Sequence, residues 1–92
     1  MHAAIVRANI PGGVNDERLK NLRDNVIPMV SGNKGFRAGY WCDVVDDKGV
    51  AFVVFDDDAS AKAAVPPPGT DMGEGVTIDT VEFREILGSA EA

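Results

Sequence analysis

Two polar side chains, Arg7 and Asn9, interrupt the apolar segment 3–10 (AAIVRANI). Side chains alternate between the faces of a strand, so these two share one face. A guanidinium and an amide together could orient a small organic acid or phenol in an otherwise apolar pocket. The alternative is structural. Arg7 would form a salt bridge with Asp79 or Glu85 on another strand, and the asparagine would close the end of its own strand.

Two large aromatic residues, Tyr40 and Trp41, are adjacent and therefore point to opposite faces of a strand. At least one should line a cavity or an interface, although core packing would also explain them. With Arg7 and Asn9 they complete the candidate ligand-binding residues. Cys42 follows directly and has no nearby histidine to activate it, so we expect a buried, inert thiol. No catalytic residue is predicted.

The acidic segment 43–49 (DVVDDKG) suggests a metal loop at first sight. It lacks the alternating oxygen ligands and the closing glutamate of a calcium loop. The single cysteine excludes a multi-cysteine site. We therefore predict no metal site, and turn or helix-cap chemistry accounts for the aspartates.

The elements that must position these residues follow from hydrophobic periodicity and turn residues. Asn15 is a suitable N-cap, and Pro28 should make the following helix irregular. In chain order we predict a strand over 3–10, a helix after Asn15 that ends within 31–35, a hairpin over 36–55 with its turn at 46–49, a short helix over 59–65, an exposed loop over 66–75 and a strand over 76–87.

The second arm of the hairpin, residues 50–55, has no polar face. Both of its apolar rows need covering, one by helices and the other by a second copy of the chain. We pair Val45 with Val50 across the turn. That register places Trp41 opposite Val54, and a slip of one residue would exchange the faces of one arm.

Length and composition describe one soluble domain over residues 1–92. A net charge of −6 argues against nucleic acid and anionic membranes as partners, because both attract an excess of Lys and Arg. No apolar run is long enough to span a bilayer, and no signal-peptide pattern opens the chain. We expect a cytoplasmic homodimer joined through the sheet.

Several segments carry a resemblance to a known group: VIPMV at 26–30, GFRAGYW at 35–41, VVF at 53–55 and VEFRE at 81–85. The predicted elements follow the order strand, helix, strand, strand, helix, strand. This is the ferredoxin-like βαββαβ arrangement of the α+β class. The sequence resembles the dimeric α+β barrel superfamily, which includes antibiotic-biosynthesis-monooxygenase-like proteins. The resemblance implies a four-stranded antiparallel sheet with two helices on one face, and two such sheets packed into a barrel.

The same resemblance raises haem as a cargo. Members that degrade haem carry an asparagine on the first strand, which Asn9 resembles, together with a tryptophan on the sheet and an iron-ligating histidine on the second helix. Trp41 is on a different strand from the expected one, and no histidine lies between Ala3 and Ala92. We therefore predict no haem binding and no cofactor.

Three functions fit these observations. The first is a homodimeric protein that binds a small organic ligand in a cavity beside the sheet. The second is a cofactor-independent monooxygenase acting on an aromatic substrate. The third is a structural or regulatory protein-interaction module. Fold alone does not choose among them, so whether the chain is an enzyme stays open.

Overall fold

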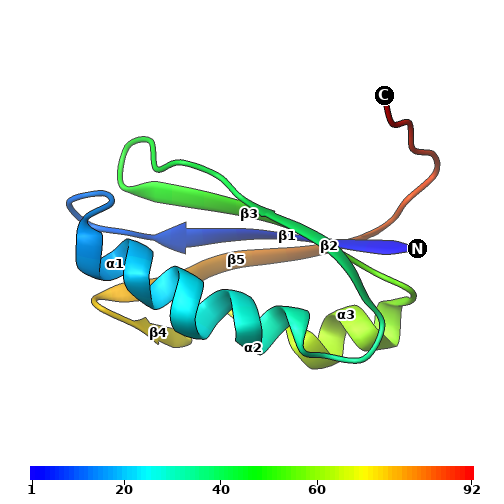
Figure 1. Ribbon diagram of the computed structural model, residues 1–92, viewed down its shortest axis with the longest axis horizontal. Coiled ribbons are helices and arrows are strands. Elements are labelled where there is room, and N and C mark those ends of the chain that lie inside the picture. The colour runs from blue at the N-terminus through cyan, green and yellow to red at the C-terminus, as the bar shows by residue number, and fades with distance from the viewer.

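A curled antiparallel sheet is the framework of the protein, and the computed structural model describes residues 1–92 (Figure 1). The strand order is β2-β3-β1-β5-β4. The strands are β1 (His2–Asn9), β2 (Phe36–Trp41), β3 (Lys48–Phe55), β4 (Asp71–Gly73) and β5 (Val76–Glu85). The α+β class with two helices is confirmed.

The prediction of four strands was wrong, because the segment predicted as a loop contains β4. Asp71 pairs with Thr77 of β5. Gly73, Glu74 and Gly75 all have positive φ, at 90°, 55° and 76°, and this left-handed run turns the chain back sharply. The glycines that indicated a loop therefore form a tight hairpin.

The first helix is continuous but changes its pitch midway. It consists of α1 (Asp16–Asn21), a π-helical turn η1 (Leu22–Val26) and α2 (Ile27–Ser31). Asn15 caps it by accepting a hydrogen bond from the Arg18 backbone N–H at 2.8 Å. Ile27 donates its backbone N–H to Leu22, five residues back. This wider turn directly precedes Pro28, which has no backbone N–H and fits poorly in a regular α-helix, so the predicted irregularity is present.

The second helix, α3 (Asp58–Ala64), begins at Asp57, whose side chain accepts a hydrogen bond from the Ser60 backbone N–H at 2.8 Å. The predicted alanine-rich helix is thereby confirmed. No helix in the structure is both long and apolar enough to cross a membrane.

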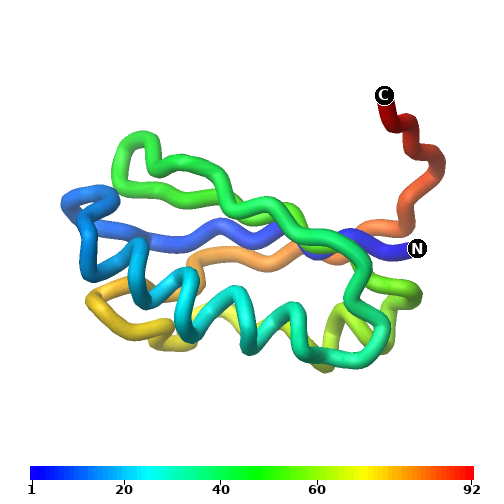
Figure 2. Tube along the Cα trace, in the orientation of Figure 1, coloured from blue at the N-terminus to red at the C-terminus, as the bar shows by residue number.

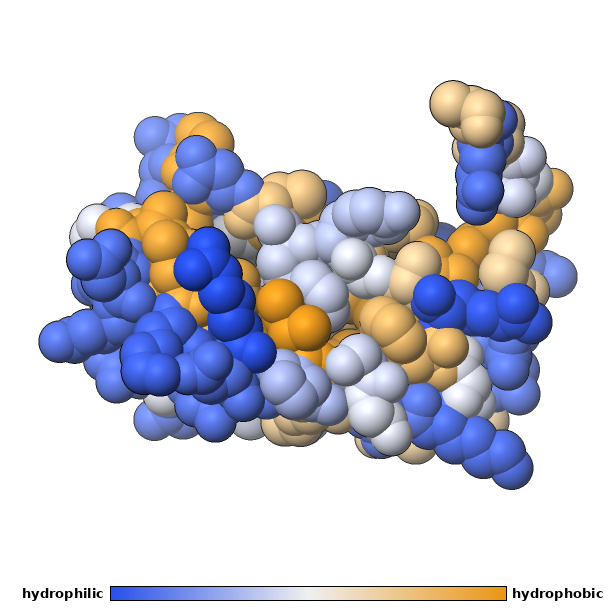
Figure 3. Space-filling view, viewed as in Figure 1, coloured by the Kyte–Doolittle hydropathy of each residue, from blue (hydrophilic) through white to orange (hydrophobic).

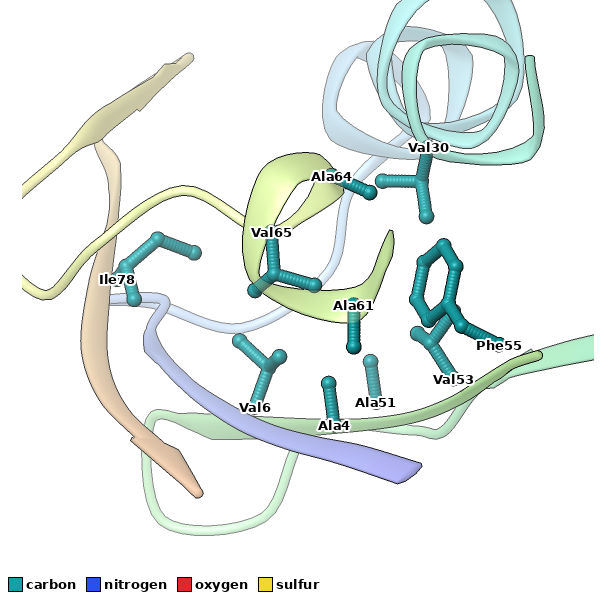
Figure 4. Packing of buried hydrophobic residues seen from close by; sticks show 10 residues of the cluster. All are labelled: Ala4, Val6, Val30, Ala51, Val53, Phe55, Ala61, Ala64, Val65 and Ile78. Carbon is teal, nitrogen blue, oxygen red and sulfur yellow. The ribbon is translucent and has the colours of Figure 1, made fainter. Parts of the chain in front are cut away.

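Both helices pack on the same face of the sheet, and the core lies between the helices and this face (Figure 4). Phe55 is fully buried and meets Phe36 edge to face, with 5.9 Å between ring centroids. Only 12 of 92 residues are buried, so the core is small for a chain of this length. The central cluster consists of Ala4, Val6, Val30, Ala51, Val53, Phe55, Ala61, Ala64, Val65 and Ile78.

The turn of the β2–β3 hairpin differs from the prediction. Asp46 and Asp47 both have positive φ, at 52° and 61°, and form a two-residue turn. Val45 therefore pairs with Lys48, and the predicted pairing of Val45 with Val50 was wrong.

The corrected register exchanges the faces of β2. Trp41 lies opposite Ala51, not opposite Val54, and the shift of three residues is odd. Trp41 therefore points to the helix-covered face. Tyr40 pairs with Phe52 and points to the other face, which no helix covers. We call this second surface the open face.

Both chain ends lie toward the same end of the sheet (Figure 2). The residues after β5 lead away from the sheet as an extended tail. The end of the sheet under α1 and β4 is therefore built only from internal segments of the chain.

The cap at Asp57 gives a prediction about acid stability. The hydrogen bonds from Ser60, backbone first, hold the pKa of the Asp57 carboxyl below its usual 3.8. A depressed folded-state pKa means that the stabilisation is complete above about pH 4 and disappears as the pH falls through the folded value. Asp57→Asn keeps an acceptor without a titrating charge, so its melting temperature should fall less between about pH 5 and pH 2.5 than that of the wild type.

Thermal unfolding followed by circular dichroism at both pH values measures this difference. Glu91→Gln in the exposed tail is the matched control and should behave as the wild type. Identical acid sensitivity in Asp57→Asn and the wild type would contradict the role of this cap.

Candidate functional site

An apolar cavity of about 330 Å³ lies between α1–η1 and the helix-covered face of the sheet. Of its 19 lining residues, 15 are hydrophobic. The sheet contributes the small residues Ala8, Gly49 and Ala51, which leave space beneath Leu19 and Leu22 of the helix. Figure 3 shows hydrophobic atoms in the band between this helix and the strands, with hydrophilic side chains around them.

Two polar side chains of α1 close one end of this cavity. Arg18 Nε donates to the carbonyl oxygen of Glu74 at 3.0 Å, and its Nη1 donates to two carbonyl oxygens of the loop 11–13. Asn21 Nδ2 donates to the carbonyl oxygen of Met72 at 3.0 Å. These hydrogen bonds join the helix to the β1–α1 loop and to the β4–β5 hairpin. The first helix thus stays in place although little side-chain packing lies beneath it.

Trp41 forms part of the cavity wall on the sheet side. Its indole ring lies over Gly39, where an added Cβ would be only 2.7 Å from Trp41 Cζ3. Only glycine leaves room for the ring at this position. Because Trp41 is the only tryptophan of the chain, its fluorescence reports directly on the cavity.

Arg7 lies on the open face and not in the cavity. Its Nη1 is 3.8 Å from Glu82 Oε1 of β5, and both side chains are more than two-fifths exposed. Arg7 therefore forms a salt bridge with another strand, as the structural alternative predicted. Its partner is Glu82 and not Asp79 or Glu85. A pair this exposed contributes little stability.

Asn9 is also held by neighbouring strands. Its Oδ1 accepts a hydrogen bond from Lys48 Nζ, and its Nδ2 donates to Thr77 Oγ1 at 3.4 Å. Tyr40 is 65% exposed on the open face. Of the four predicted ligand-binding residues, the structure places only Trp41 at the cavity, and the sheet separates it from the other three.

The sequence interpretation missed the cavity residues on the first helix, of which Arg18 and Asn21 are the polar ones. One signal was available. Ala8 and Ala51 are small residues on the row that faces the helices, and small residues under a helix leave space. Recognising it needed the correct hairpin register.

Cys42 is exposed and lines the cavity, so the prediction of a buried thiol was wrong. Its backbone N–H donates to the Val50 carbonyl oxygen at 2.8 Å at the point where β2 leaves the ladder. A strand interior would have buried the thiol, whereas the strand end does not.

We therefore expect Ellman's reagent to modify Cys42 in the native protein at a rate within about tenfold of that in denaturant, because the thiol is accessible without unfolding. The measurement is the absorbance of the released thiolate, with Cys42→Ser as the blank. Native labelling that is slower by orders of magnitude would contradict this exposed position.

The open face carries a continuous apolar strip over its central strands. Val50 and Phe52 are 37% and 39% exposed, and Ile5 and Val54 are partly exposed beside them. Tyr40 extends the strip to the edge. Charged pairs between β1, β3 and β5 border it, including Arg7 with Glu82 and Lys48 with Asp79.

No three His, Cys, Asp or Glu side chains lie together in a group that could hold a metal ion. Comparison with models of protein families, with curated proteins and with solved structures found no match to this chain.

Proposed function

We propose that this protein binds a small organic molecule in the cavity between α1–η1 and the sheet. The observation that carries the proposal is an apolar cavity of about 330 Å³ next to a small core. Ligand pockets occupy roughly 300–1,000 Å³ and are lined mainly by hydrophobic side chains with a few polar groups. An empty cavity lowers stability, because the side chains that line it lose packing contacts. In a chain with so few buried residues, such a cavity is better explained by a ligand that fills it.

The proposal includes a homodimer in which the open faces of two sheets pack together, as in the dimeric α+β barrel superfamily. The apolar strip around Phe52 supports this, because exposed apolar surface on the central strands of a sheet is costly without a cover. A second copy also fits the charges. Arg7 and Arg84 flank Glu82, so a two-fold axis could bring opposite charges of the two copies together.

The cavity is tested with 1-adamantanemethanol, a compact, neutral molecule that neither absorbs nor emits near tryptophan. Its addition should alter the wavelength and the intensity of the Trp41 emission, and this change should saturate. The expected dissociation constant is between about 10 μM and 1 mM, for about twelve non-hydrogen atoms at roughly 0.3–0.6 kcal/mol each. Ala8→Leu should weaken this binding at least about tenfold, because the larger side chain fills the cavity.

Ala63→Leu is the matched control. It makes the same substitution on the exposed side of α3 and should leave the titration unchanged. If Trp41 emission does not respond to the alcohol, or if Ala8→Leu binds it as well as the wild type does, the cavity is not the binding site.

A further inference from the structure

We infer that the cavity takes neutral hydrophobic molecules and discriminates against carboxylates, and that Asp43 contributes to this selectivity. The inference rests on the proposed function and adds the charge of the ligand to it. It follows from the two charged residues in the lining, Arg18 and Asp43.

Arg18 is the only cationic residue of the lining, and its guanidinium already donates hydrogen bonds to backbone carbonyl oxygens. A guanidinium binds both oxygens of a carboxylate along one of two edges, Nε with Nη2 or Nη1 with Nη2. Nε donates to the Glu74 carbonyl oxygen. Nη1 donates to the carbonyl oxygens of Pro11 and Gly13. Each edge therefore has one nitrogen committed, and neither can receive a carboxylate in the two-pronged manner.

The amide in the lining is committed as well. Asn21 Nδ2 donates to the Met72 carbonyl oxygen, and Asn21 Oδ1 accepts from Asn25 Nδ2 at 2.8 Å. An anionic ligand would thus lose water without gaining a full set of donors, which is unfavourable in an apolar cavity.

Asp43 places a negative charge at the same cavity. Its Oδ1 accepts the Val44 backbone N–H at 2.8 Å, and no other hydrogen bond or ion pair reaches the carboxylate. Arg18 keeps its positive charge, but it forms no ion pair with Asp43, because its Nε and Nη1 hydrogens are directed at backbone carbonyl oxygens. The Asp43 carboxylate would therefore repel an anion in the cavity, whereas it would not repel a neutral molecule of the same shape.

A matched pair of probes tests this inference: 1-adamantanemethanol and 1-adamantanecarboxylate, titrated at pH 8 with Trp41 emission as the readout. The two share one hydrocarbon cage and differ in charge. We expect the carboxylate to bind at least about tenfold more weakly than the alcohol. Asp43→Asn, an isosteric change at an exposed position, should narrow the difference in affinity between the two probes by at least about threefold.

The outcomes separate the two proposals. Equal or tighter binding of the carboxylate would overturn the charge selectivity and leave the cavity as a binding site. A gap that Asp43→Asn does not alter would overturn the role of this residue. If neither probe binds, the proposed function fails, and the selectivity fails with it.

Discussion

Phe52→Asp should convert the protein from a dimer into a monomer. Phe52 is 39% exposed in the single chain and lies in the middle of the apolar strip on the open face, opposite Tyr40. In a dimer joined through this face, the aspartate would be buried without a partner, and its counterpart in the second copy would lie near it. An unpaired buried charge costs several kcal/mol, which is enough to dissociate a modest interface at micromolar concentration.

Light scattering coupled to size-exclusion chromatography measures the change. The wild type should have twice the 9.7 kDa mass of one chain, and the variant should have that mass once. Val45→Asp is the matched control, because it introduces the same charge at a 69% exposed valine of the hairpin turn. A wild type that stays monomeric at about 100 μM would show that the open face does not pair with a second copy.

Phe55→Ala should cause the largest loss of stability of any single truncation in the core. Phe55 is the largest fully buried side chain and contacts Phe36 edge to face between the sheet and the helices. Removing a buried phenylalanine ring costs about 3–5 kcal/mol, against a total of about 5–15 kcal/mol for a small domain. Urea denaturation should therefore give the variant a much lower unfolding midpoint than the wild type, with a similar slope.

Phe52→Ala is the comparison within the same strand. It removes the same ring from the opposite face, where 39% of the side chain is exposed. Its loss of stability should be smaller and should depend on protein concentration, since part of it comes from the dimer, whereas the loss in Phe55→Ala should not. Equal, concentration-independent losses would mean that the two faces of β3 are not covered as we describe.

The order of the elements could be predicted from the sequence because local signals determine it. Asn15 and Asp57 cap the helices, and the breakers at 11–13 and 66–69 end a strand and a helix where expected. The hairpin at 71–77 could not be predicted as well, because a tight turn of residues with positive φ has the same composition as an irregular loop.

The candidate site was much less predictable than the fold. Its position depends on the register of one hairpin. The two-residue turn at Asp46 and Asp47 moves the partner of Val45 by two residues, and a further one-residue step between Val45 and Trp41 makes the total shift odd. An odd shift moved Trp41 to the helix-covered face and Tyr40 to the open face. Arg7 and Asn9 were correctly placed on one face together, yet that face is not the one with the cavity. The shift of three residues in pairing therefore leaves Trp41 alone at the cavity and places Tyr40 on the same face as Arg7 and Asn9.

Nuclear Overhauser effects between 1-adamantanemethanol and methyl-labelled protein test the central claim most directly. Our account predicts contacts from the hydrocarbon cage to the methyl groups of Leu22 and Ile78, which line the cavity from the helix and from the sheet. Contacts to Ile5 and Val54 on the open face, or no contacts at a saturating concentration of the alcohol, would contradict it.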